Sequence, residues 1–60
     1  MMPLVVVSFD YDPEFDIRTQ YLRYFKIISN ANAFMLFERV RGLDAWVFKT
    51  DSEEFDAIKE

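Results

Sequence analysis

The chain has 60 residues, of which 11 are acidic and 7 are basic, and its formal net charge is −4. This length predicts one small domain, whose core alone supplies only about 3–5 kcal/mol of stability. Because the sequence contains neither cysteine nor histidine, it excludes disulfides, zinc sites built from these residues, and Ser–His or Cys–His nucleophiles. Self-association or a partner protein is therefore expected to stabilise the domain.

The opening of the chain predicts a strand over residues 4–10. Residues 4–7 (LVVV) form a continuous apolar run rich in β-branched side chains, which is typical of a strand with both faces covered. The run is too short for a membrane span and lacks the basic flank of a signal peptide, so we expect a cytoplasmic protein with no membrane partner.

A helix is predicted to follow. Asp12, Pro13 and Glu14 have the types expected at an N-cap, at the first helical position and in the first turn. The helix would run from Glu14 to about Ser29, with an apolar sector wider than one sheet face requires. That excess predicts a second buried contact, as in a homodimer.

The second half of the chain contains one ambiguous segment and two clearer ones. Residues 33–41 fit a strand, which we favour, or a helix that begins at an Asn32 cap and ends before Gly42. Residues 45–50 (AWVFKT) predict a strand, with its aromatic side chains in the core. Residues 51–54 (DSEE) have the form of a capping box, which predicts a short C-terminal helix.

These elements predict an α+β fold in the order β-α-β-β-α. That order corresponds to a truncated ferredoxin-like domain, with a three-stranded sheet and two helices on one face. The first and third strands would be parallel, and the first would keep a free edge where a fourth strand is missing. Because an uncovered edge invites pairing, we expect a homodimer, or capture of this edge by another protein.

Two stretches of the sequence, residues 5–12 (VVVSFDYD) and residues 37–42 (FERVRG), resemble a known group of small ferredoxin-like proteins. The group comprises ribonucleases and antitoxins related to the nuclease subunit of CRISPR adaptation, and includes virulence-associated protein D and the type V antitoxin GhoS. The resemblance implies a role for Asp10, because an acidic residue at this position in each protomer would hold a divalent metal for phosphodiester cleavage. Magnesium suits such a carboxylate site. The alternative is that Asp10 merely ends the strand.

The charges suggest the binding surfaces. Parallel first and third strands would bring the acidic starts of both helices to one rim of the sheet together with Asp10, although acids also favour helix N-termini for electrostatic reasons alone. The predicted partner-binding residues are Asp12, Glu14, Asp16, Asp51, Glu53, Glu54 and Asp56. An alternative nucleic-acid surface would use Arg39, Arg41 and Lys49.

Two functions remain open from the sequence. The favoured one is a small acidic regulator or inhibitor without a cofactor, which binds a basic surface of another protein. Antitoxins and virus-encoded inhibitors of host-defence enzymes, including mimics of nucleic acid, are of this kind. The alternative is a magnesium-dependent endoribonuclease, a homodimer that uses Asp10 to cleave RNA.

Overall fold

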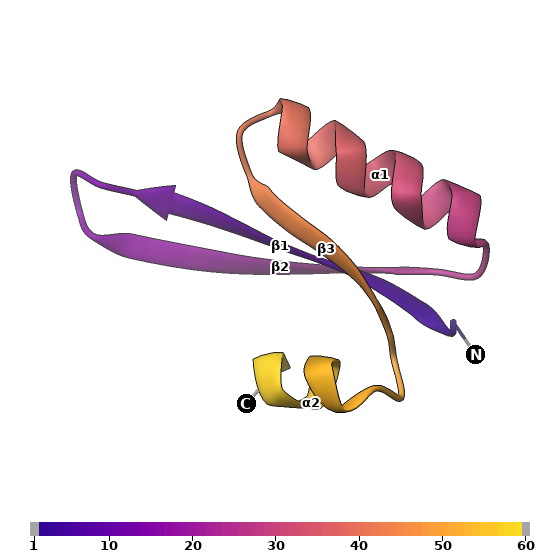
Figure 1. The fold of residues 1–60 in the computed structure, drawn as a ribbon. Coiled ribbons are helices and arrows are strands. Elements are labelled where there is room, and N and C mark those ends of the chain that lie inside the picture. The colour runs from indigo at the N-terminus through magenta and orange to yellow at the C-terminus, as the bar shows by residue number, and fades with distance from the viewer. Residues whose placement is uncertain (1, 60) are drawn as a thin grey trace.

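The computed structural model describes residues 2–59 and contains one antiparallel sheet with two helices (Figure 1). The strands lie in the order β2-β1-β3, so the α+β class with three strands and two helices is confirmed. In chain order the elements are β1 (Leu4–Asp12), β2 (Ile17–Phe25), α1 (Ile28–Val40), β3 (Asp44–Lys49) and α2 (Glu53–Lys59).

β1 is the central strand, which explains its continuous apolar sequence. Val6 packs with Ala31 of α1, whereas Val5 and Val7 pack with Phe55 of α2 on the opposite face. The two helices therefore cover opposite faces of the sheet (Figure 1), and the prediction of both on one face is wrong. All strand pairings are antiparallel, so the predicted parallel pair and the predicted free edge of the first strand are wrong as well.

The predicted helix over residues 14–29 is wrong, because most of this segment forms β2. Asp12 does not cap a helix; its Oδ1 accepts a hydrogen bond from the Glu14 N–H at 3.0 Å, and this bond closes a turn. Pro at the second position of a turn has the same φ as at the first position of a helix, so the same residues suit both. Asp16 then adopts φ 53°, which leads the chain back into a strand rich in β-branched and aromatic residues.

The strand favoured over residues 33–41 is also wrong, and the helical alternative is correct. α1 begins four residues before the expected Asn32 cap, and it ends in a Schellman motif. The Gly42 N–H donates to the Arg39 carbonyl at 3.0 Å, and the Leu43 N–H donates to the Glu38 carbonyl at 3.1 Å. Gly42 has φ 96°, a conformation that glycine adopts without strain.

The last two elements agree with the sequence. β3 and the short α2 are confirmed, and the N-cap of α2 is Ser52, whose Oγ accepts from the Phe55 N–H at 3.2 Å and donates to the Lys49 carbonyl. The element order is β-β-α-β-α, which corrects the expected ferredoxin-like order. Within residues 2–59, no helix combines the length and the apolar character that crossing a bilayer requires.

Candidate functional site

The β1–β2 hairpin projects from the body of the molecule. β3 pairs with β1 only from Leu4 to Phe9, whereas β2 pairs with β1 along its whole length. Residues 10–19 therefore form a two-stranded ribbon that extends beyond both helices (Figure 1). We refer to residues 10–19 as the hairpin arm.

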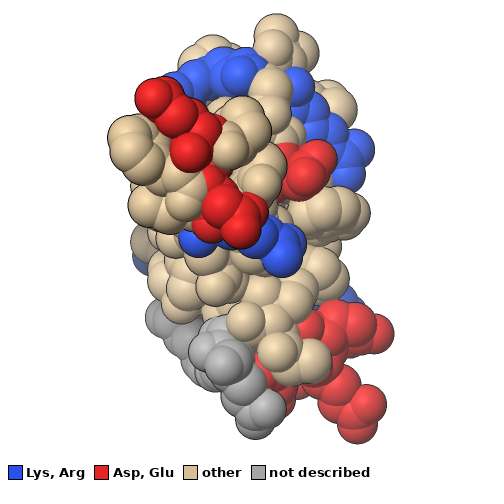
Figure 2. Space-filling view, turned by 90° about the vertical axis from the view of Figure 1, so that its left-hand side faces the viewer, with Lys and Arg blue, Asp and Glu red and all other residues tan. Residues whose placement is uncertain are grey.

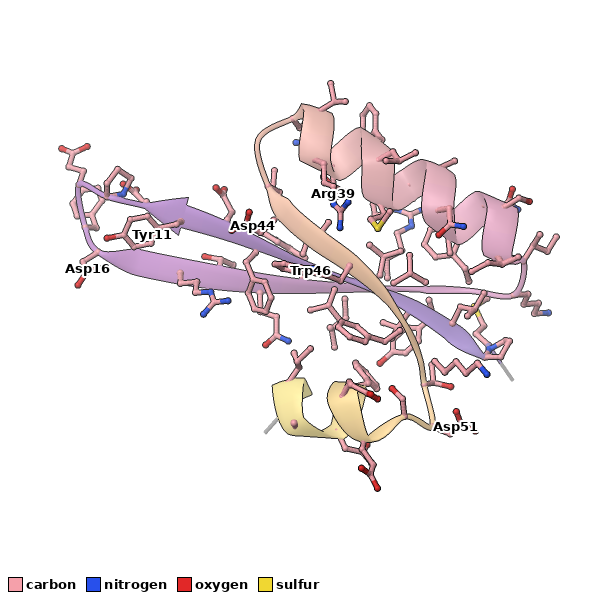
Figure 3. The ribbon with its side chains drawn as sticks, in the orientation of Figure 1. Tyr11, Asp16, Arg39, Asp44, Trp46 and Asp51 are labelled. Atoms are coloured by element: carbon pink, nitrogen blue, oxygen red, sulfur yellow. The ribbon has the colours of Figure 1, made fainter. Side chains whose placement is uncertain are left out.

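The tip of the hairpin arm is held in one conformation by two side-chain hydrogen bonds. One is the turn-closing bond to Asp12, and in the other the Tyr11 hydroxyl donates to Asp16 Oδ1 at 2.7 Å. This bond to the Asp16 carboxylate, together with a smaller contribution from desolvation, raises the pKa of Tyr11 above its ordinary value. Since Tyr11 belongs to β1 and Asp16 is the last residue of the turn, the bond ties the turn to β1 where the ribbon is otherwise unsupported (Figure 3).

The hairpin arm combines negative charge with exposed apolar side chains. It carries four exposed carboxylates, and its one basic residue is Arg18, whose guanidinium lies over the Phe9 ring at 3.9 Å. Tyr11 and Ile17 are exposed, and Phe15 at the tip is 66% exposed. The four carboxylates belong to Asp10, Asp12, Glu14 and Asp16.

The second acidic group lies elsewhere, at the start of α2. Because β3 is antiparallel to β1, it ends beside the start of β1, where the Thr50 N–H donates to the Pro3 carbonyl at 2.9 Å. Asp16 and Asp51 consequently lie at opposite ends of the sheet (Figure 3). The single acidic rim predicted from parallel strands does not form, and the acidic side chains make separate groups (Figure 2). The group at α2 comprises Asp51, Glu53, Glu54 and Asp56.

A polar groove of about 370 Å³ opens on the face of the sheet that α1 covers. Its wall includes Glu38, which is only 7% exposed and whose Oε2 lies 3.1 Å from Arg41 Nη1. Ser8 is buried beside them, and Arg23 and Asp10 line the remaining sides. The groove therefore carries charges of both signs, and one carboxylate is already neutralised by a neighbouring arginine.

Asp10, the candidate metal ligand, lies at the rim of this groove. It is exposed and pairs with Thr19 across the arm. Among residues 2–59, no three His, Cys, Asp or Glu side chains lie close enough together to hold a metal ion. Mg²⁺ is commonly held by one or two carboxylates together with waters and substrate phosphates, so Asp10 would be one ligand of such a site.

The three candidate nucleic-acid-binding residues are not brought together. Arg39 Nε donates to the Ala45 carbonyl of β3 at 2.9 Å, and Arg41 is held by Glu38. Both arginines lie at the end of α1, whereas Lys49 is at the far end of β3. Phe48 packs into the core under α2 as predicted, but Trp46 is exposed and meets Phe9 edge-on at 6.1 Å.

Two important residues were missed from the sequence. Phe15 was assigned to the apolar face of a helix, although Asp-Pro between two β-prone stretches is also a turn signal, and a turn would have exposed it. Glu38 is buried because α1 turns it toward the sheet, and its i, i+3 spacing to Arg41 indicates their ion pair only when this segment is taken as a helix.

No known protein family, curated protein or solved structure matches the chain.

Proposed function

We propose that this protein is a small acidic regulator or inhibitor that binds another protein, and that it docks through the hairpin arm on a basic surface. The observation that carries the proposal is the arm itself, a projecting ribbon with four carboxylates around an exposed Phe15. Such a ribbon contributes little to the core of its own domain, so its composition is explained more readily by binding than by folding.

The charge of the hairpin arm suits rapid association. Carboxylates concentrated at a projecting tip create a negative field that steers a basic partner and suppresses encounters with acidic ones. The whole chain has a formal net charge of −4, of which residues 10–19 carry −3 and the rest −1, so the rest of the molecule does not oppose this field. The partner surface is therefore expected to be rich in lysine and arginine.

The apolar residues of the hairpin arm suit a stable complex. Large aromatic side chains at the centre of an interface commonly contribute most of the binding energy. Phe15 sits in a turn already fixed by the Asp12 and Tyr11 hydrogen bonds, so little conformational entropy is lost when it is buried. We expect Phe15 to enter an apolar pocket surrounded by basic residues.

A basic surface with apolar pockets is typical of proteins that bind nucleic acid, because phosphates need cations and bases need stacking partners. An antitoxin, or an inhibitor of a host-defence nuclease, would occupy such a surface with carboxylates in place of phosphates. The charge and the projecting shape of the hairpin arm are the grounds for this class of partner.

The test is a comparison of two matched double variants. Asp10→Asn with Glu14→Gln removes two charges from the hairpin arm and spares both hydrogen bonds of the turn. Glu53→Gln with Glu54→Gln removes two charges at the far end of the sheet. In capture from a lysate of the cells that contain the protein, a partner should be retained by wild type and by the α2 variant, and depleted with the arm variant.

Equal retention of every partner by the two variants would contradict docking through the hairpin arm. A different outcome would replace the proposal altogether. If the purified protein cleaves RNA with Mg²⁺, and Asp10→Asn abolishes cleavage without changing the thermal unfolding midpoint, the protein is a nuclease.

A further inference from the structure

The outer edge of β2 is unprotected. β2 lies at the edge of the sheet and pairs with β1 alone, which leaves its other backbone edge without a strand partner in the described chain. The strand is nine residues long, and eight of these residues are exposed. It contains neither proline nor lysine, which commonly protect an edge, and the guanidinium groups of its two charged residues, Arg18 and Arg23, lie over the rings of Phe9 and Phe34.

The opposite edge of the sheet differs in these respects. β3 has only six residues, and the Arg39 guanidinium donates a hydrogen bond to its Ala45 carbonyl. The chain entering β3 is also held to the end of α1 through the Leu43 N–H. Pairing with an additional strand is therefore expected at β2 rather than at β3.

Exposed apolar side chains lie on both faces of β2. By the register with β1, Tyr21 faces the α1 side, whereas Leu22 and Tyr24 face the α2 side, and all three are at least 41% exposed. A long edge strand with apolar residues on both faces is favourable for pairing with another strand.

We infer that a second copy of this chain binds β2, and that the two β2 strands pair antiparallel around a two-fold axis at Tyr21, which forms one six-stranded sheet. Tyr21 is the middle residue of β2, so this register pairs all nine residues of each copy. A two-fold axis perpendicular to the sheet keeps α1 of both copies on the same face.

On the α1 face, the register places compatible side chains opposite one another. Tyr21 meets the same residue of the second copy at the axis. Thr19 lies opposite Arg23, and Ile17 lies opposite Phe25, each pair occurring twice by symmetry. Aromatic and β-branched cross-strand pairs are among the more stabilising ones.

The opposite face is equally free of conflict. Arg18 lies opposite Tyr24, a combination that permits a cation–π contact, and Gln20 lies opposite Leu22. No two like charges are paired on either face. By contrast, centring the axis on Arg23 would place two guanidinium groups opposite each other, which is destabilising.

The same register brings opposite charges together just beyond the strand ends. Asp16 is the turn residue before Ile17 and Lys26 follows Phe25, so pairing of Ile17 with Phe25 brings Asp16 of one copy near Lys26 of the second copy, again twice. Both residues are exposed in the single chain. This charge complementarity favours a second copy over an unrelated strand, because both members of each charge pair are supplied by β2 and its flanking residues.

A second copy would also supply the stability that the small core lacks. The buried apolar residues are few and mostly small, with Phe55 the largest of them. A standard interface buries about 800 Å² per partner. That is about one sixth of the 4595 Å² accessible surface of the single chain. An interface of this size requires burial of both the β2 edge and its exposed aromatic side chains.

The inferred dimer overlaps the hairpin arm only at residues 16–19 and leaves residues 10–15 outside the pairing. It uses the outer edge of β2 and leaves the β1 side of the hairpin arm outside the pairing. It also keeps the two Asp10 residues about 20 Å apart, as judged from the spacing of strands and residues, so it does not create a shared metal site.

The test uses single cysteines, because the chain has none of its own. Tyr21→Cys places its thiol at the axis, where opposite residues lie about 5 Å apart and a disulfide can form. Thr19→Cys is the matched control on the same face, since the two copies of residue 19 would be about 13 Å apart. Mild oxidation should cross-link Tyr21→Cys nearly completely and Thr19→Cys at least tenfold less.

A mixture of two single-cysteine variants provides a positive control for Thr19→Cys. Mixing Thr19→Cys with Arg23→Cys should restore efficient cross-linking, because these positions face each other in the inferred register. Tyr21 and its neighbours are exposed, so these substitutions leave the core intact, and circular dichroism checks that each variant is folded.

Sedimentation of the wild type supplies the second measurement. We expect a dimer at micromolar concentration and at least tenfold weaker association in Lys26→Glu. A folded wild-type monomer at 100 micromolar or above would overturn the inference. Cross-linking that is equal at residues 19 and 21 would overturn it too, since the dimer would then use a different register or surface.

Discussion

Replacement of Phe15 by alanine separates binding from folding. Phe15 is 66% exposed at the tip of the hairpin arm, so its truncation should change the free energy of unfolding by less than about 0.5 kcal/mol. A fully buried aromatic side chain removes about 150–250 Å² from water, so about two thirds of that area remains to be buried by a partner. At about 25 cal/mol per Å², this burial is worth about 2.5–4 kcal/mol.

The alanine variant keeps the β-carbon, so we expect it to lose about 2–3 kcal/mol of binding free energy, or about 30- to 150-fold in affinity. Calorimetric titration with the captured partner measures the loss, and thermal unfolding measures the stability. Val40→Ala is the control, because Val40 is 87% exposed and belongs to α1, outside the hairpin arm. Equal affinities of Phe15→Ala and wild type would refute the anchoring role of Phe15.

Three further predictions concern the fold. Phe55→Ala removes a side chain that is 2% exposed, and its expected cost of about 3–5 kcal/mol should leave the isolated protein largely unfolded in circular dichroism. Gly42→Ala should cost only about 1–2 kcal/mol in thermal unfolding, since φ is 96° but no atom lies within 4 Å of an added β-carbon. Asp16→Gly keeps the backbone conformation and removes the acceptor for Tyr11, so NMR titration should show the Tyr11 pKa returning toward its ordinary value near 10. Because the native pKa is raised, the contribution of this bond to stability is present at neutral pH and is lost as the pH rises through that pKa.

The sequence predicted the structure best at positions where a single physical requirement determines the local conformation. The LVVV run requires burial on both faces, and β1 has it as the central strand. Residues 51–54 combine a serine with acidic residues just after β3, so the sequence predicted the start of α2 to within one residue of its observed N-cap, Ser52. Gly42 marked the end of the helical alternative, because the residue after a helix C-cap commonly has a positive φ, which glycine adopts without strain.

The errors have a physical cause as well. The sequence Asp-Pro-Glu suits the start of a helix and a turn equally well in its local hydrogen bonds and φ angles. Which of the two forms depends on whether the following residues can pair with another strand. Ile17–Phe25 finds β1, and pairing with β1 along nine residues outweighs a helix whose wide apolar sector would have had nothing to cover it.

The candidate site depended on that same choice. Once β2 is a strand, the acids around Pro13 cease to be the start of a helix and become the tip of a hairpin. Antiparallel pairing of β3 then places the α2 acids at the opposite end of the sheet. Local charge patterns show where the acidic residues lie in the sequence, but only the long-range pairing decides which of them lie together in the structure.

The most direct test of binding through the hairpin arm is the rate of association with the captured partner, measured at low and high salt by surface plasmon resonance. For Asp10→Asn with Glu14→Gln, we expect association about 3- to 10-fold slower than for wild type at low ionic strength, with the difference disappearing as salt screens the charges. Glu53→Gln with Glu54→Gln has the same net charge and should associate at nearly the wild-type rate. If both double variants slow association equally, only net charge matters, and docking through the hairpin arm is contradicted.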